Sequence, residues 1–198
     1  MVVPSPVPLP KTPKEALRAA MRAERRAYAA SLDHDTRIEL EARLAELLDP
    51  LLFASSIVAA YFPMKDELSP LPALARARAM GKEAALPCFA DRDSRMTFRA
   101  GDPVDPGPWG IRQPTGDAPI VSPDLVLVPL LAIDGLGNRI GMGKGHYDRA
   151  LPGLRSAGAR LIGIGWPFQR VSEPISSDPW DIALDGFASP SEIEEFNR

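Results

Sequence analysis

Cysteine is almost absent from this sequence: Cys88 is the single one among 198 residues. One cysteine cannot form a disulfide within the chain, and its setting in Ala-Leu-Pro-Cys-Phe is typical of a buried strand residue rather than of a nucleophile. We therefore expect neither a disulfide-built scaffold nor thiol catalysis.

Long apolar runs, a targeting segment and an excess of basic charge are also missing. No stretch approaches the roughly 18 apolar residues of a membrane span, and the N-terminus lacks a basic region followed by an apolar core. The net charge is -3, which gives no electrostatic reason to expect a nucleic-acid partner. We therefore expect a cytoplasmic protein that binds neither membranes nor nucleic acid.

What the sequence does contain is the composition of an ordinary globular domain, with 45% hydrophobic residues and both charge signs mixed. Residues 1–13 carry five prolines, so we expect a flexible Pro-rich arm there. Residues 14–198 are expected to form one domain.

Apolar periodicity and turn residues predict the order of elements in this domain. Helices are expected over 14–28, 33–48, 69–80 and 147–158, with an acidic helix over 190–198. Strands are expected over 55–61, 82–89, 95–99, 160–166 and 182–189, and the apolar run over 123–133 predicts a strand buried on both faces. Strand, glycine loop, helix and strand then form a βαβ unit, which favours an α/β fold with a mostly parallel sheet.

The segment after the apolar run holds five glycines between residues 135 and 145. Glycines at alternate positions leave peptide N–H groups unshielded, so successive amides can converge on an anion; these glycines are Gly141, Gly143 and Gly145. Lys144 and Arg139 add positive charge, and Asp148 at the start of the next helix is placed to hold a divalent metal. The pattern predicts a phosphate site, and a glycine-rich turn with solvated charges stays open as the alternative.

The spacing of this loop excludes two common nucleotide motifs. A P-loop requires Ser or Thr after Gly-Lys, but Gly145 follows Lys144. A dinucleotide fingerprint requires a third glycine where Tyr147 or Asp148 stands. The loop is therefore of a different kind.

The helix expected from residue 14 carries Lys14 and Arg18 four residues apart on one face. Two cations at that spacing repel each other, and a bound anion would relieve the repulsion. A solvated basic face explains the pattern equally well. Arg22, Arg25 and Arg26 continue the basic character and are expected at the surface.

The motif around the glycine loop closely resembles the signature of the 5-formyltetrahydrofolate cyclo-ligase family, also called methenyltetrahydrofolate synthetase. Its elements are Val-Pro at the end of a strand, Asp five residues later and then Asn-Arg-Ile-Gly-x-Gly-Lys-Gly-x-Tyr-Asp-Arg. The resemblance covers nearly the whole chain, from Lys14 to Ser189. It implies a single catalytic domain over 14–198 with a three-layer α/β/α fold and a mostly parallel central sheet, NagB/RpiA/CoA transferase-like in type.

The resemblance also implies a reaction, the ATP-dependent cyclisation of 5-formyltetrahydrofolate to 5,10-methenyltetrahydrofolate with release of ADP and phosphate. Mg²⁺ would be the cofactor, 5-formyltetrahydrofolate and ATP the partners, and a monomer the active form. Phosphoryl transfer requires mainly positioning and charge neutralisation, which the basic residues and the glycine loop can supply.

Site residues follow from the resemblance, position by position. The expected ATP-binding residues are Lys14, Arg18, Arg139, Ile140, Gly141, Met142, Gly143, Lys144, Gly145, His146, Tyr147 and Asp148. The expected substrate-binding residues are Met64, Glu67, Trp109, His146 and Tyr147. The catalytic candidates are Arg139, Lys144 and Tyr147, and the expected metal ligands are Asp148 and Asp181.

Two of these assignments have structural alternatives that the residues support as well. Glu67, with Asp66 before it, can instead cap the helix expected from residue 69. Asp181 can instead be a turn residue.

Three positions depart from the family pattern. Gln113 stands where Glu is usual, His146 where many members have Tyr, and Trp180 where His is more frequent. An imidazole at position 146 would add a group that titrates near neutral pH. These departures leave open a divergent paralogue that uses the ATP cradle on another formyl or acyl-amide substrate, and a non-catalytic nucleotide- or sugar-phosphate-binding module.

Overall fold

The computed structural model describes residues 12–91 and 94–196, and of Trp109 only the backbone. Most of the expected Pro-rich arm lies outside the described residues. Helix α1 (Pro13–Ser31) begins at Pro13, because Thr12 and Glu15 form a capping box ahead of it. The Thr12 hydroxyl accepts from the Glu15 amide at 3.2 Å, and the Thr12 amide donates to the Glu15 carboxylate at 2.9 Å.

A seven-stranded sheet forms the centre of the molecule. Its strands, in spatial order, are β11 (Ile193–Glu195), β10 (Gly186–Ala188), β9 (Arg160–Ile164), β6 (Leu125–Pro129), β1 (Ile57–Ala59), β2 (Glu83–Cys88) and β3 (Thr97–Ala100). The strands from β10 to β2 run parallel, and β11 and β3 add antiparallel edges. The expected mostly parallel sheet is confirmed.

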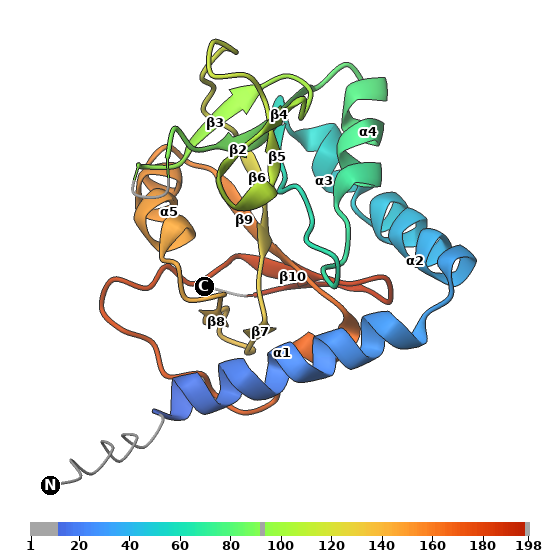
Figure 1. Cartoon of the computed structure of the whole chain (residues 1–198), viewed down its shortest axis with the longest axis vertical. Coiled ribbons are helices and arrows are strands. Elements are labelled where there is room, and N and C mark those ends of the chain that lie inside the picture. The colour runs from blue at the N-terminus through green and yellow to red at the C-terminus, as the bar shows by residue number, and fades with distance from the viewer. Residues whose placement is uncertain (1–11, 92–93, 197–198) are drawn as a thin grey trace, which may run out of the picture.

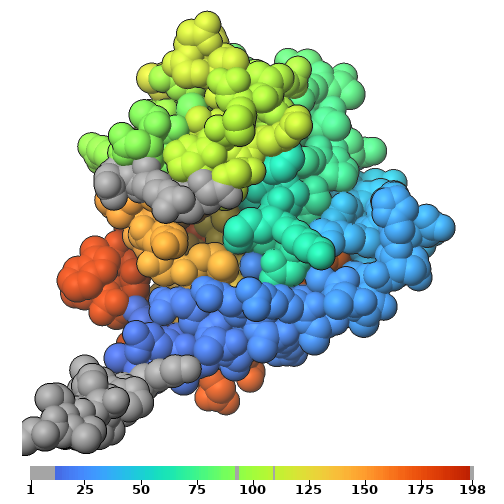
Figure 2. Space-filling view, viewed as in Figure 1, coloured from blue at the N-terminus to red at the C-terminus, as the bar shows by residue number. Residues whose placement is uncertain are grey.

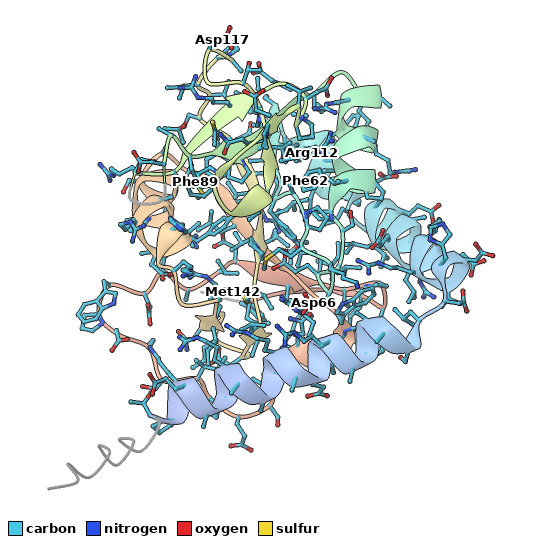
Figure 3. The ribbon with its side chains drawn as sticks, viewed as in Figure 1. Phe62, Asp66, Phe89, Arg112, Asp117 and Met142 are labelled. Atoms are coloured by element: carbon cyan, nitrogen blue, oxygen red, sulfur yellow. The ribbon has the colours of Figure 1, made fainter. Side chains whose placement is uncertain are left out.

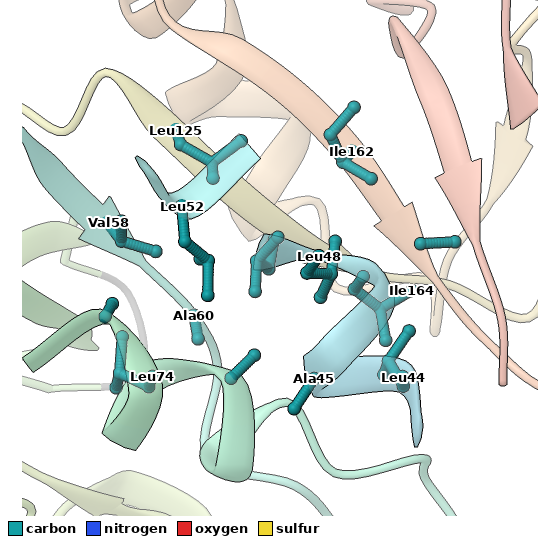
Figure 4. Close-up of a cluster of buried hydrophobic side chains, with 14 of the residues drawn as sticks. Leu44, Ala45, Leu48, Leu52, Val58, Ala60, Leu74, Leu125, Ile162 and Ile164 are labelled. Carbon is teal, nitrogen blue, oxygen red and sulfur yellow. The ribbon is translucent and has the colours of Figure 1, made fainter. Parts of the chain in front are cut away.

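Helices cover both faces of the sheet (Figure 1). One face carries α2 (His34–Leu47), α3 (Asp49–Ala54) and α4 (Leu71–Ala79), whose apolar side chains pack on β1, β6 and β9. Figure 4 shows this cluster, with Leu48 and Leu52 of the helical layer near Leu125 and Ile162 of the sheet. The other face carries α5 (His146–Ser156), which contributes Leu151 to a second cluster. The three-layer α/β/α architecture follows from this arrangement.

Strand β6 shows why the apolar run of the sequence is continuous. Leu125 and Leu127 pack toward α2–α4, whereas Val126 and Val128 pack toward α5, so successive residues are buried on opposite faces. The strand ends at Pro129. The rest of the run forms β7 (Ala132–Ile133), which pairs with β8 (Arg139–Ile140) in a separate hairpin that leads into the glycine loop.

The expected C-terminal helix over 190–198 is wrong. Residues 193–195 form β11, which pairs antiparallel with β10, and the last two residues lie outside the described part of the chain. Phe196 is buried in the α5-side cluster, and the Glu194 carboxylate accepts from Arg170 Nε at 2.6 Å. A free sheet edge and a buried aromatic ring outweigh the helix propensity of this acidic segment.

The proline- and glycine-rich excursion between β3 and β6 has a small hairpin of its own. Strand β4 (Asp105–Pro106) pairs with β5 (Arg112–Gln113) around the 3₁₀ turn η1 (Pro108–Gly110). A second 3₁₀ turn, η2 (Pro167–Gln169), follows β9. Within the described residues, none of the helices has both the length and the apolarity needed to span a membrane.

The order of the parallel strands reverses between β1 and β6. The chain proceeds from β1 to β2 in one direction, and from β6 through β9 to β10 in the other. Loops that leave the carboxyl ends of β1 and β6 therefore separate and open a crevice, which is where open α/β sheets bind ligands.

Candidate active site

A cavity of about 380 Å³ lies at the point where the strand order reverses. Its walls come from α1, the segment after β1, the ends of β2 and β6, and the loop from β8 into α5. In Figure 3, Phe62, Phe89 and Met142 mark three of these segments. The surface view shows α1, the segment after β1 and α5 meeting on one face of the molecule (Figure 2). The volume lies within the range of small-molecule sites.

The glycine loop forms the wall toward α5. Gly143 and Gly145 have φ of 86° and 69°, which an L side chain rarely adopts, and Gly145 is the N-terminal cap of α5. Among the described residues no side chain caps α5, so the positive end of its helix dipole meets the glycine loop at Gly145, where an anion is favoured. Gly141 does not have positive φ, so the conformational need for glycine falls on the other two.

The four predicted cations near this loop fall into two pairs, one in the cavity wall and one outside it. Arg139 and Lys144 line the cavity itself. Arg139 donates to the Ile182 carbonyl at 2.8 Å and also pairs with Asp148. Burial lowers the pKa of Arg139, and the nearby carboxylates of Asp148 and Asp181 oppose that effect. The guanidinium therefore pairs with one expected metal ligand, Asp148, and lies near the other, Asp181.

Lys14 and Arg18 lie outside the cavity wall, on the other side of the loop. Arg18 Nε donates to the Gly141 carbonyl at 3.1 Å, which fixes the loop from α1. Lys14 Nζ pairs with Asp178 at 2.7 Å and with Asp181 at 3.0 Å. Burial lowers the pKa of Lys14, but its hydrogen bonds to these two aspartates outweigh burial and raise it.

Asp148 and Asp181, the expected metal ligands, are each paired with a cation. Among the described residues, no group of three or more His, Cys, Asp or Glu side chains could hold a metal ion. A magnesium ion in a phosphate site requires only one or two carboxylates, because the phosphate oxygens and water complete its shell. The residues present therefore fit a metal that arrives with a nucleotide.

Glu67 forms the opposite wall of the cavity and is 6% exposed. Its carboxylate accepts from the Met64 amide at 2.9 Å and from Arg25 Nη1 at 3.3 Å. Burial raises the pKa of Glu67, while Arg25 and the Met64 amide work against that rise. Both predicted residues of this segment, Met64 and Glu67, line the cavity.

Tyr147 and His146 complete the wall at the start of α5. The Tyr147 hydroxyl is buried and has no hydrogen-bond partner within the described residues. Burial raises the pKa of Tyr147, and the charge of Glu67 raises it further, so the phenol stays a donor. Burial and the charges of Arg149 and Lys144 lower the pKa of His146, which favours the neutral imidazole.

Comparison with known proteins identifies the family of this chain. The model of the 5-formyltetrahydrofolate cyclo-ligase family matches residues 10–190. The chain belongs to the 5-formyltetrahydrofolate cyclo-ligase family. The family resemblance predicted from the motif is confirmed, and the relatives indicate the ligase activity expected from it.

Two relatives illustrate the similarity at the level of sequence. The 5-formyltetrahydrofolate cyclo-ligase of Mycolicibacterium smegmatis is 28% identical over 192 residues, which cover 89% of this chain and 93% of that protein. The cyclo-ligase of Escherichia coli K12 is 27% identical over 155 residues, 74% of this chain and 85% of that protein.

Solved structures show the same fold. The NMR structure of Aquifex aeolicus 5,10-methenyltetrahydrofolate synthetase matches with a TM-score of 0.78 and 26% identity, covering 94% of each chain. The Mycoplasma pneumoniae synthetase matches with a TM-score of 0.69 and 23% identity, covering 90% of this chain and 99% of that one. The expected α/β fold is thus confirmed against cyclo-ligase structures.

Most residues carried over from the cyclo-ligase motif lie at the cavity. Those in its wall are Met64, Glu67, Arg139, Gly141, Met142, Gly143, Lys144, Gly145, His146, Tyr147 and Asp148. Ile140 does not reach it, because its side chain is buried in a cluster with Met21 and Leu131. Trp109 was expected to bind substrate, and its side chain lies outside the described part of the structure.

Several wall residues were missed from the sequence. Arg22, Tyr61, Phe62, Phe89 and Ile111 line the cavity. The expectation that Arg25 lies at the surface is wrong, because Arg25 is 1% exposed. Arg22 is half-buried, with its Nε buried and its side chain in the cavity wall. Helical spacing carried a signal for Arg25.

That signal is the position of Arg25 in α1. It stands four residues after Met21 and three before Tyr28, two residues of the apolar face. The same spacing therefore turns Arg25 inward with them. The sequence interpretation placed Arg25 at the surface because its side chain is charged, although its helical spacing indicated the inner face.

Proposed function

We propose that the chain converts 5-formyltetrahydrofolate and ATP into 5,10-methenyltetrahydrofolate, ADP and phosphate. The observation that carries the proposal is one cavity with two chemically different walls. The glycine loop and Lys144 offer backbone amides and positive charge on one side, and Glu67 offers a carboxylate among apolar side chains on the other. A triphosphate fits the first wall, and a flat heterocycle with N–H groups fits the second.

The proposed role of the cationic wall is to position the triphosphate. The amides of Gly143 and Gly145 and of the first turn of α5 would bind phosphate oxygens, and Lys144 would neutralise charge on the transferring group. Arg139 offers a planar guanidinium that matches phosphate oxygens, once ATP competes with Asp148 for it. Lys14 and Arg18 would add charge behind the loop.

The opposite wall would bind the folate ring. A carboxylate accepts hydrogen bonds only, so an ionised Glu67 suits the N–H-bearing edge of a pterin. Phe62, Phe89 and Met64 supply apolar contact for the ring faces. The buried Tyr147 hydroxyl, which has no hydrogen-bond partner among the described residues, would donate to an oxygen of the substrate.

The proposed chemistry has two steps. The formyl oxygen attacks the γ-phosphorus, the bond to ADP breaks, and an imidate-like phosphate forms on the folate. The neighbouring folate nitrogen attacks the formyl carbon and gives its proton to the departing phosphate, the carbon–oxygen bond breaks, and the ring closes. The protein's part is to align the oxygen with phosphorus and to neutralise charge, so no protein nucleophile is needed.

Mg²⁺ belongs to the proposal as the ion that accompanies ATP. Asp148, which lines the cavity, and Asp181, which lies near Arg139, would hold it beside the phosphates. When bound, the ion would neutralise phosphate charge. A monomeric form and a cytoplasmic location stay predictions from the sequence.

A spectroscopic assay tests the activity. Purified protein with 5-formyltetrahydrofolate and Mg-ATP should develop the absorbance of the methenyl product, with ADP formed in equal amount. ATP binding without that product would favour a paralogue that acts on another formyl or acyl-amide substrate. Binding of ligand without any turnover would favour the non-catalytic module.

A variant pair extends the assay to the cationic wall. Lys144→Ala should lower kcat about 100-fold or more, the usual effect of removing a charge-stabilising donor, with little change in thermal stability. Lys82→Ala is the matched control, because Lys82 lies outside the cavity and contacts Phe53. Wild-type turnover in Lys144→Ala would contradict the proposed cradle.

A further inference from the structure

Arg25 is a buried cation at the junction of three functional segments. The side chain comes from the inner face of α1, and the residue is 1% exposed. Its Nε lies 2.9 Å from Asp66 Oδ2, and its Nη1 lies 3.3 Å from Glu67 Oε1. One guanidinium thus contacts both carboxylates of the segment that follows β1.

The remaining contacts of Arg25 reach the other two segments. Nη1 also points at the Leu130 carbonyl, just past the end of β6, at 3.5 Å. Nη2 lies 3.8 Å from the thioether sulfur of Met142 in the glycine loop. Arg25 therefore connects three parts of the cavity: the segment after β1 that holds Glu67, the end of β6 and the glycine loop.

A cation in such a place is not needed for packing alone. Removing a guanidinium from water is costly unless charged partners surround it, and apolar side chains of similar size usually fill such space as well or better. Arg26, the next residue of the same helix, is exposed. The inward position of Arg25 thus points to a role for its charge.

That role concerns Glu67, whose carboxylate is nearly buried. Burial raises the pKa of Glu67, Arg25 and the Met64 amide lower it, and the adjacent Asp66 raises it again. The phenols of Tyr61 and Tyr147 lie close enough to interact with it, and Arg37 of α2 donates to the Glu67 carbonyl at 2.7 Å. Among these groups, the cation in contact with the carboxylate itself is Arg25.

We propose that Arg25 is a positioning residue that keeps Glu67 ionised and aimed at the cavity, so that this wall only accepts hydrogen bonds from the substrate. The inference rests on the proposed function, since it assigns Glu67 to the N–H-bearing edge of the folate. A protonated Glu67 would present a donor there instead. Asp66 shares the guanidinium and holds it against Glu67.

The test is the pH dependence of kcat/KM for 5-formyltetrahydrofolate in Arg25→Gln, with Arg26→Gln as the matched control. Removing an adjacent opposite charge raises a carboxyl pKa by about 1 to 3 units, so the acid limb of the profile should move to higher pH by that amount. KM for the folate should rise more than kcat falls, and KM for ATP should change little. Arg26→Gln should follow the wild-type profile.

A double variant separates positioning from a loss of packing. If Arg25 acts through Glu67, adding Arg25→Gln to Glu67→Gln should cause no further loss of folate affinity. Additive losses, or an unshifted acid limb in Arg25→Gln, would overturn the proposal. Arg25→Lys keeps the charge and should keep the limb near its wild-type position, which a purely structural role would not predict.

Folding and activity are controlled separately. Circular dichroism and thermal unfolding establish whether Arg25→Gln is folded, and the Arg25→Lys profile decides the question if it is not. If wild-type protein forms no methenyl product, the proposed activity fails, and a ¹³C NMR titration of the Glu67 carboxyl still tests the role of Arg25. An equal Glu67 pKa in wild type and Arg25→Gln would then reject it.

Discussion

Gln113 decides how Phe89 is held at the cavity wall. Its side-chain nitrogen donates to the Phe89 carbonyl and its oxygen accepts from the Phe89 amide, each at 3.0 Å. The Phe89 ring in turn meets His146 edge-on, with centroids 4.8 Å apart. An amide offers the one donor and one acceptor that this backbone requires, whereas an ionised carboxylate offers no donor. The departure from the family's usual Glu therefore has a local structural reason.

Gln113→Glu tests this pairing. Near pH 8 the carboxylate would face the Phe89 carbonyl without a proton, so we expect a loss of about 1–3 kcal/mol in unfolding free energy and a higher folate KM. Near pH 5 the introduced carboxylate is protonated more readily, which restores a hydrogen-bond donor, so the loss of unfolding free energy should be smaller. Urea unfolding at both pH values measures it. Arg112→Gln, at an exposed neighbour in β5, is the control, and equal losses at both pH values would contradict the explanation.

The glycine loop and α1 act together as elements. Gly143 has positive φ, and a Cβ added there would come within 3.5 Å of Arg18 Nε, the side chain that fixes the loop from α1. The local sequence predicted this loop because glycine spacing is a local property. It did not predict that Arg22 and Arg25 of α1 also contact this loop, at the thioether sulfur of Met142.

Gly143→Ala should weaken both the loop and nucleotide binding. Positive φ costs a residue with a Cβ about 1–2 kcal/mol, so unfolding free energy should fall by about that amount and KM for ATP should rise. Gly153→Ala is the matched control, because Gly153 lies inside α5 with open space around it, and Ala there should stabilise the helix by about 0.5–1 kcal/mol. Chemical unfolding and ATP titration measure both. Similar changes in the two variants would contradict a special role for the loop.

The edges of the sheet show the limit of element prediction. The segment over 193–195 has the composition of an acidic helix end, yet it is strand β11, because β10 offers a free edge and Arg170 offers a partner for Glu194. Neither cause is visible within a short window of sequence. Strands β6 and β9 were predictable, because a run buried on both faces is apolar throughout.

At the scale of the whole molecule, buried carboxylates tie distant segments together. Asp134 is 1% exposed and accepts from the amides of Leu136 and Asn138 and from the Ile175 amide, at 2.8–2.9 Å. Burial works to raise the pKa of Asp134, but these hydrogen bonds and the Asn138 side chain outweigh burial and lower it. The hairpin of β7 and β8 is thereby joined to the chain beyond β9.

This lowered pKa predicts acid sensitivity. The contribution of Asp134 is complete above the unfolded aspartate pKa of about 3.9 and is lost as pH falls through the lower folded value. Asp134→Asn should cost about 1–3 kcal/mol at pH 7, because its amide would face N–H donors, and it should flatten the loss of stability below about pH 4. Urea unfolding from pH 7 to pH 3 measures both effects.

A surface carboxylate provides the control for this prediction. Asp102 is exposed and pairs with Arg78 at 3.1 Å, so Asp102→Asn should leave the acid slope close to that of the wild type. If unfolding free energy falls with pH as steeply in Asp134→Asn as in the wild type, other carboxylates account for the loss of stability in acid.

The sequence by itself determined the α/β class, the glycine loop and the family, because periodicity, glycine spacing and a contiguous motif are local. It also placed Met64 and Glu67 in the segment after the first strand, where they line the cavity. Only the tertiary structure decided that Arg25 faces inward, that Gln113 holds Phe89 and that residues 193–195 form a strand. Those outcomes depend on contacts between residues far apart in the sequence, such as Arg25 and Met142, which are 117 positions apart. Whether a side chain is buried is decided only when such segments meet.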